Sequence, residues 1–119
     1  MDYNFDVMLD NVPVVTVKAN LKDRTAAFVK HTDDRRKLPA YLYGLYGFRA
    51  TEPSFYWLEK FIEDRTFPRE RMNCNDLLAW MGLDRYDVWE INRKTHGITT
   101  DDPFWLRFEG ESVTREELR

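Results

Sequence analysis

One cysteine and two histidines are the side chains best suited to nucleophilic or metal chemistry. Cys74 is predicted to lie in the first turn of a helix, where the positive end of the helix dipole favours a thiolate. His96 would serve as its base if folding brings the two side chains together. A small, half-buried residue beside a helix cap is the simpler interpretation of Cys74. The single cysteine excludes an internal disulfide and is typical of a reducing compartment.

A metal centre is not predicted, because a closed zinc site needs four ligands at short spacing. His31 and His96 have no ligand partner at such spacing. Asp33-Asp34 and Asp101-Asp102 are adjacent acids of the kind found in solvated turns. No pair of carboxylates stands out on an apolar strand or helix. We therefore expect no metal, no cofactor and no catalytic residue, and hence a protein that is not an enzyme.

Basic and aromatic side chains gather between residues 35 and 48. Such rings can stack on nucleic-acid bases, and tyrosine, tryptophan and arginine also anchor protein interfaces. The net charge of −3 and the neighbouring Asp33-Asp34 favour a protein partner over nucleic acid. The residues that we predict to contact a partner are Arg35, Arg36, Tyr41, Tyr43, Tyr46 and Trp105.

The composition indicates one globular domain with a surplus of rings. A chain of 119 residues with 43% hydrophobic side chains has the size and content of a single domain. Aromatic residues make up 15% of it, more than one small core readily hides, so some rings are expected to be exposed for a purpose. No secretory signal or apolar run of membrane length is present, which predicts a cytoplasmic protein that does not enter the membrane.

The elements that must position these residues begin with β-structure. Tyr3–Leu9 and Val12–Lys18 are predicted as a hairpin joined by a two-residue turn at Asp10-Asn11, because both turn residues tolerate left-handed geometry. Pro13 favours an edge or a bulge in the second strand. Thr25–His31 is predicted as a third strand. The cross-strand neighbours expected in the hairpin are Leu9 with Val12, Val7 with Val14, and Phe5 with Thr16.

Three short helices follow, each predicted from its caps. Thr51 is expected to cap the first helix, and Asn73 with Asp76 to form a capping box for the second, which Gly82 ends. The third is expected to start near Asp87 and to end at Gly97. Leu38–Phe48 holds two glycines and several rings, and its structure stays open. Phe104–Glu109 alternates again and is predicted as a strand that returns to the sheet, with Trp105 on its polar side.

These elements predict an α+β fold. An antiparallel sheet is built from the N-terminal hairpin, the third strand and the C-terminal strand, and about three short helices pack on one face. We expect a single domain over residues 1–119, mainly β over 1–50, helical over 51–97, and with the returning strand over 104–110.

The second half of the chain also resembles a known family. Its motifs follow one another in a familiar order, covering about half of the chain: Trp57-Leu58-Glu59, Glu63-Asp64-Arg65, Pro68, Arg71-Met72-Asn73, Leu77-Leu78, Gly82-Leu83, Tyr86-Asp87, Thr95-His96-Gly97 and Asp102-Pro103-Phe104-Trp105. The order resembles the segment ahead of the kinase core in HipA-like proteins, particularly the short-arm versions of Gram-positive bacteria. It is also similar to small uncharacterised proteins carried on integrative and conjugative elements.

The resemblance implies recognition without kinase chemistry. A HipA-like kinase needs a phosphate-binding loop, a catalytic aspartate and a metal-binding residue on a following lobe. The five glycines of this sequence are scattered and form no such loop, and we expect no kinase lobe after the matching segment. The resemblance therefore implies a recognition or docking segment.

These observations lead to a functional hypothesis. We expect a non-enzymatic binding protein of a mobile genetic element that inhibits a host defence nuclease of the CRISPR type, or its guide complex. The alternative is a nucleic-acid-binding regulator or a stand-alone HipA-docking or antitoxin-like module. A small hydrolase that uses Cys74 and His96 is a third hypothesis. The oligomeric state stays open.

Overall fold

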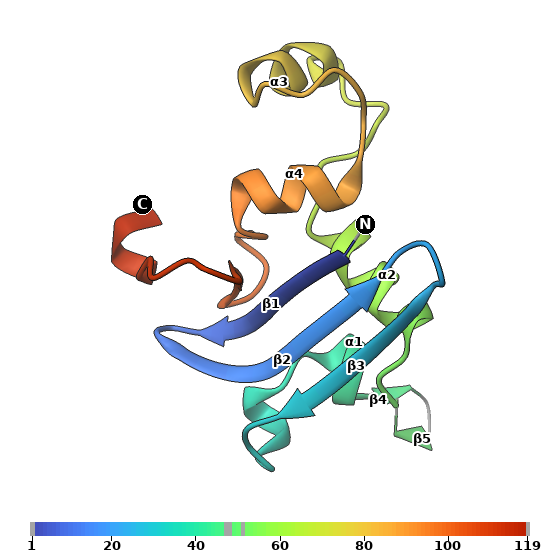
Figure 1. Ribbon diagram of the computed structural model, residues 1–119, viewed down its shortest axis with the longest axis vertical. Helices are drawn as coiled ribbons and strands as arrows, with labels where there is room; N and C mark the ends of the chain where they lie inside the picture. Colours follow the sequence, from blue (N-terminus) through green and yellow to red (C-terminus); the bar gives the residue numbers. More distant parts are fainter. Residues whose placement is uncertain (1, 47–48, 51, 119) are drawn as a thin grey trace.

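A four-stranded antiparallel sheet forms the centre of the molecule (Figure 1). The computed structural model describes residues 2–46, 49–50 and 52–118. The strands stand in the order β3-β2-β1-β6, so the C-terminal strand returns to the sheet as the sequence predicts, and it pairs with β1. Together with the helices described next, this sheet confirms the predicted α+β fold. The strands are β1 (Asp2–Leu9), β2 (Val12–Asn20), β3 (Thr25–Lys30) and β6 (Phe104–Phe108).

Helices α1 and α2 lie behind the sheet in the view of Figure 1, and α3 stands at the end of the molecule opposite to β3. The helices are α1 (Ala40–Tyr43), α2 (Phe55–Asp64), α3 (Cys74–Trp80) and α4 (Val88–Thr95). The segment whose structure the sequence leaves open contains α1 and the start of a two-stranded ribbon. The remaining elements are the 3₁₀ turns η1 (Arg35–Lys37) and η2 (Arg115–Leu118), and the ribbon of β4 (Leu45–Tyr46) and β5 (Arg49–Ala50).

A bulge in β2 changes the predicted hairpin register. Leu9 pairs with Val12 as expected, but the register shifts between Val7 and Met8, so that Val7 pairs with Val15. The predicted pairs of Val7 with Val14 and of Phe5 with Thr16 are therefore wrong by one residue. A bulge at this point agrees with the position of Pro13, which cannot donate to the ladder. The physical gain is that Val15, Val17 and Ala19 now share the buried face with Val7, Phe5 and Tyr3.

Three of the five predicted helix-cap residues, Asp87, Gly82 and Gly97, act as the sequence predicts. Asp87 caps α4 by accepting hydrogen bonds from the backbone N–H groups of Trp89 and Glu90, and Gly82 and Gly97 take positive φ angles after α3 and α4. Asn73 precedes α3 but makes no side-chain capping bond, so the predicted capping box is wrong. Helix α2 is capped by Ser54, whose Oγ accepts from the N–H of Trp57. The predicted cap Thr51 lies outside the described residues.

The main core lies between the sheet and helices α2 and α4. Alternating residues of β1 and β2 meet the inner stripe of α2, where Leu58 and Ile62 are fully buried. Tyr3 stacks on Trp89 of α4 at 5.3 Å between ring centroids, and its hydroxyl donates a hydrogen bond of 2.7 Å to Oε1 of Glu90. This bond lets a tyrosine be completely buried without an unsatisfied hydroxyl.

A second, smaller cluster joins α3 to the outer side of α4. Cys74 and Leu78 of α3 meet Ile91 of α4, and partly buried rings and aliphatic side chains surround them. Helix α3 shares no residue with the main core. It therefore depends on α4 for its position.

The buried tyrosine of β1 predicts a loss of stability in alkali. Burial, together with the hydrogen bond to Glu90, raises the pKa of Tyr3 well above its usual value of 10.0. The folded protein thus keeps this proton above pH 10, where the unfolded chain releases it, and stability falls as pH rises past that value. Urea unfolding followed from pH 8 to pH 11 should show this fall. Tyr3→Phe should flatten the slope, whereas Tyr56→Phe, which alters an exposed ring, should not. An equal slope in both variants would contradict the assignment.

Candidate functional site

The predicted basic residues lie on an exposed 3₁₀ turn after β3. Asp34 caps this turn by accepting a hydrogen bond from the backbone N–H of Arg36, whose guanidinium also donates two bonds of 3.2 Å to the same carboxylate. These bonds from Arg36 hold the pKa of Asp34 below its usual range. Arg35 and Lys37 are exposed and form no ion pair with any described residue. The turn thus presents two cations that are not neutralised.

The predicted tyrosines follow on α1, directly after this turn. Tyr41 and Tyr43 are half-buried and pack against the main core. The ammonium group of Lys30 lies 5.8 Å from the centroid of the Tyr43 ring, and burial raises the pKa of Tyr43. Tyr46 falls in β4, but its side chain lies outside the described residues. Arg35 and Arg36 on η1 thus precede Tyr41 and Tyr43 on α1 by a few residues of chain, and their joint role as contact residues stays a prediction.

The aromatic surface continues from α1 onto α2. The Tyr41 ring lies 6.2 Å from that of Trp57, which meets the edge of Tyr56 at 5.1 Å. Lys60 lies over the Tyr56 ring at 5.5 Å. Tyr56 is not among the predicted contact residues, although its position two residues before Leu58 places it on the opposite side of the helix from the core stripe. We call the set Tyr41, Tyr43, Tyr56 and Trp57 the aromatic surface.

Trp105 does not belong to this surface, and its prediction as a contact residue is corrected by the structure. Its side chain is completely buried, and its Nε1 donates a hydrogen bond of 2.6 Å to the carbonyl of Asp10. The alternation is as predicted, because Trp105 pairs with Met8 on the sheet face opposite to Leu106. That face is buried at this end, since Met8 is also fully buried. Trp105 therefore holds the sheet to the β1–β2 turn.

The exposed tryptophan of the chain is instead Trp80, at the end of α3. Its side chain is 84% exposed, and Met72 before the same helix is fully exposed. Trp80 borders a cavity of about 420 Å³ together with Met81, Ile98 and others. The exposure of Trp80 could have been predicted from the sequence, because Trp80 falls opposite to Leu78 on the helix, outside the buried stripe of Cys74 and Leu78. Trp80 and Tyr56 are thus exposed rings of the kind that the aromatic content of the sequence predicts.

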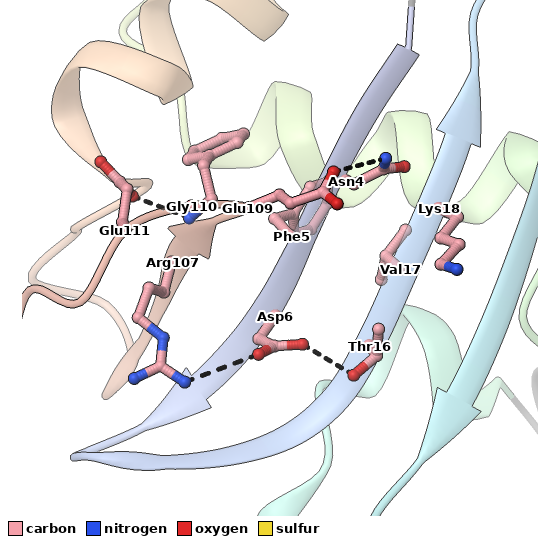
Figure 2. A pocket seen from close by; sticks show the side chains of 11 residues that line it. Asn4, Phe5, Asp6, Thr16, Val17, Lys18, Arg107, Glu109, Gly110 and Glu111 are labelled. Carbon is pink, nitrogen blue, oxygen red and sulfur yellow. Dashed lines mark hydrogen bonds and ion pairs between the residues drawn. The ribbon is translucent and has the colours of Figure 1, made fainter.

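The sheet face turned away from the helices is polar and slightly hollow. A shallow cavity of about 210 Å³ opens there over β2, β1 and β6 (Figure 2). Thr16 donates a hydrogen bond of 2.7 Å to Asp6, which also faces the guanidinium of Arg107 at 3.6 Å. Asn4 donates to Glu109 at 2.8 Å. The acids and bases of this face mainly satisfy one another.

This polar face does not hold an activated nucleophile. The hydroxyl of Thr16 lies 2.7 Å from Nε2 of His31 as well as 2.7 Å from Asp6. A hydroxyl has one hydrogen, and here it is donated to the carboxylate, so the histidine must be the donor in the other bond. His31 therefore cannot take the proton of Thr16 in this arrangement, as a general base would.

The hypothetical pair of Cys74 and His96 is not assembled either. Cys74 lines a cavity with Arg69 and Tyr86, whereas His96 lines the separate cavity beside Trp80. Nε2 of His96 lies 2.9 Å from Oε2 of Glu111. The described residues contain no group of three or more potential metal ligands among histidine, cysteine and acids. Across the same part of the chain, no helix has the length and apolar character that crossing a bilayer requires.

The comparisons with known proteins leave the aromatic surface as the main guide to function. No protein-family model, no curated protein and no solved structure matches this chain. The resemblance to the leading segment of HipA-like proteins therefore stays a prediction from the order of its motifs.

Proposed function

We propose that this protein is a non-enzymatic binding module that recognises a protein partner through its aromatic surface. The observation that carries the proposal is the continuous row of rings on α1 and α2, in which Tyr56 is 56% exposed and Tyr41 contacts Trp57. Rings of this kind supply large contact area with few rotatable bonds, and they are the usual anchors of protein interfaces.

The charges beside the surface define the chemistry of the partner. Arg35 and Lys37 precede the tyrosines of α1 by a few residues and form no ion pair with a described residue. Lys60, which pairs with Glu63 at 3.6 Å, borders the row at its other end. An acidic patch on the partner would complement these cations and accelerate association. This favours a partner surface that combines acidic groups with apolar pockets for the rings.

The resemblance to proteins of mobile elements supports a more specific proposal. We propose a cytoplasmic protein of a mobile genetic element whose partner is a CRISPR-type effector nuclease or its guide complex. Blocking such an enzyme requires only a surface and no chemistry. The polar sheet face and the two separate cavities of Cys74 and His96 supply no competing catalytic arrangement among the described residues.

The test is capture of purified effector nucleases, with and without guide RNA, by the immobilised protein, together with an interference assay in cells. Binding and loss of interference are expected for the wild type. Arg35→Glu combined with Tyr56→Ala should weaken binding by about 10-fold or more, because it removes one anchor ring and reverses one flanking charge. Lys22→Glu, which reverses an exposed cation in the β2–β3 turn, is the matched control and should bind as the wild type.

Two results would count against this proposal. Undisturbed interference with no retained nuclease would remove the nuclease as the partner. Retention on single-stranded nucleic acid at about 50 mM salt, lost steeply as salt is raised, would favour the nucleic-acid-binding alternative. In that case Arg35→Glu should reduce the salt slope and Tyr56→Ala the affinity.

A further inference from the structure

The two edges of the central sheet differ in whether their outward backbone groups are hydrogen-bonded. At the β6 edge, every second residue turns its backbone away from β1, and these outward groups, except the carbonyl of Leu106, are bonded to other parts of the same chain. The bonds run from Arg65 Nη2 to the carbonyl of Phe104 at 2.6 Å, from the N–H of Leu106 to the carbonyl of His96 at 2.7 Å, and from the N–H of Phe108 to Oε1 of Glu111 at 2.8 Å. Apart from the carbonyl of Leu106, this edge is closed.

At the β3 edge, the backbone N–H and carbonyl groups that point away from β2 have no hydrogen-bond partner among the described residues. The N–H of His31 donates to the carbonyl of Val14 at 2.9 Å, which fixes the residues of β3 whose backbone faces β2. Because hydrogen-bonding direction alternates along an antiparallel strand, Ala26, Phe28 and Lys30 turn their backbone outward. No described residue of the chain bonds to these three outward positions.

Strand β3 has one feature that keeps an edge strand from pairing, the charged Lys30 at its end, and lacks the others. Natural edges are protected by prolines, bulges, interior charges or covering segments. Residues 25–29 are Thr-Ala-Ala-Phe-Val, without a charge or a proline, and their pairing with β2 runs without a bulge. Val29 is 57% exposed on the open face. Figure 1 shows β3 at the margin of the sheet, with strand β2 on its other side.

We propose that β3 pairs with β3 of a second copy of this chain, so that two sheets join into one of eight strands. A two-fold axis beside Phe28 would place Phe28 opposite its own copy and Ala26 opposite the other copy's Lys30. This register uses every outward N–H and carbonyl of the strand, because Ala26, Phe28 and Lys30 are the three outward residues. It also sets the exposed Val29 against the other copy's Ala27.

The chemistry of the strand favours its own copy as the occupant. In the proposed register no two like charges stand opposite, since the single charged residue, Lys30, meets an alanine. The small side chains of Ala26 and Ala27 leave the backbone accessible to a neighbouring strand. An interface of this kind is isologous, meaning that both copies use the same patch. The aromatic surface lies on the helical layer and meets this edge at one point, because the ammonium group of Lys30 lies 5.8 Å from the centroid of the Tyr43 ring.

The unmodified protein provides the first test. Sedimentation at increasing concentration should show conversion from monomer to dimer. Hydrogen exchange should be slow for the N–H groups of Ala27 and Val29 at all concentrations, because they face β2. The N–H groups of Ala26 and Phe28 should exchange fast in the dilute protein and slowly in the concentrated one. A protein that stays monomeric up to about 1 mM, a weak affinity by the usual scale, would overturn the proposal.

Charged substitutions on the open face test the register. Ala27→Lys with Val29→Lys places like charges opposite each other across the interface and should weaken dimerisation by about 10-fold or more. Ala27→Glu with Val29→Lys places opposite charges in the same positions and should keep the dimer within about threefold of the wild type. Both double variants alter exposed positions only, and thermal unfolding of each checks that the fold is kept. Equal weakening in both, or a dimer that ignores both, would overturn the proposed pairing.

Discussion

Replacing Arg65 with methionine should lower the free energy of unfolding by about 3 kcal/mol, the lower end of the range for breaking a buried ion pair. The Arg65 side chain is almost completely buried at 1% exposure, and its Nη1 and Nη2 donate to the carboxylate of Asp102 at 3.0 and 2.8 Å. Nε donates to the carbonyl of Gly97 at 2.6 Å, and Nη2 also reaches that of Phe104. The lower end applies because Asp102 is one-third exposed.

The reason for this loss is that one guanidinium donates hydrogen bonds to three residues, Gly97, Asp102 and Phe104. Methionine fills similar space, and the Arg65 guanidinium stacks over the Phe61 ring at 4.8 Å, so the packing changes less than the hydrogen bonding. The carbonyls of Gly97 and Phe104 and the carboxylate of Asp102 lose their donor in a site that water reaches poorly. Urea unfolding at pH 7, followed by tryptophan fluorescence, measures the difference.

A matched control is Arg36→Met, which removes the exposed pair with Asp34. Its unfolding midpoint should equal that of the wild type, because an exposed pair in water contributes little. If both arginine variants unfold at the wild-type midpoint, the hydrogen bonds of Arg65 to Gly97, Asp102 and Phe104 do not stabilise the fold as expected. Loss of these bonds should also open the β6 edge, since Arg65 bonds the outward carbonyl of Phe104.

The second large effect is expected for Trp105→Ala, which should destabilise the fold by about 3–5 kcal/mol. The ring is fully buried beside Met8, and its removal leaves a cavity and an unpaired carbonyl at Asp10. Trp105→Phe keeps most of the apolar volume but loses the hydrogen bond, so it should cost less than the alanine variant. Thermal or urea unfolding gives both values.

Trp80→Ala is the control for this experiment. Its ring is 84% exposed, so its removal should leave the unfolding midpoint nearly unchanged. The comparison separates the two interpretations of Trp105, because a contact residue would weaken partner binding and leave stability intact. A stable Trp105→Ala protein would restore the sequence-based prediction and contradict its buried position.

Much of the local structure could be predicted from short-range chemistry. Asp87, Gly82 and Gly97 act where the sequence places them, because a capping side chain or a positive φ angle depends on neighbours in the chain. The alternation of Phe104–Phe108 predicted both the strand and the opposite orientation of Trp105 and Leu106. The basic turn η1 and the tyrosines of α1 are separated by only a few residues of chain.

Other features could not be predicted from the chain because they depend on distant partners. The burial of Arg65 could not be predicted, because nothing near it in the sequence indicates that Asp102 and Gly97, more than thirty positions away, will bind its side chain. Trp105 lies on the polar side of its strand, and its burial depends on the packing of that face around Met8 and on Asp10. The register of β2 depends on a bulge that a strict period of two cannot show.

The sequence by itself thus determined the fold class, most element ends and the short distance along the chain between Arg35, Tyr41 and Tyr43. It could do so because propensity, caps and periodicity act over a few residues. Tertiary structure alone decided which rings are exposed, which arginine is buried and which sheet edge is open. Exposure and hydrogen-bond satisfaction belong to the assembled surface, and they depend on segments that meet only after folding. Tyr56, Trp80 and the outward backbone of β3 gained their significance from that assembly.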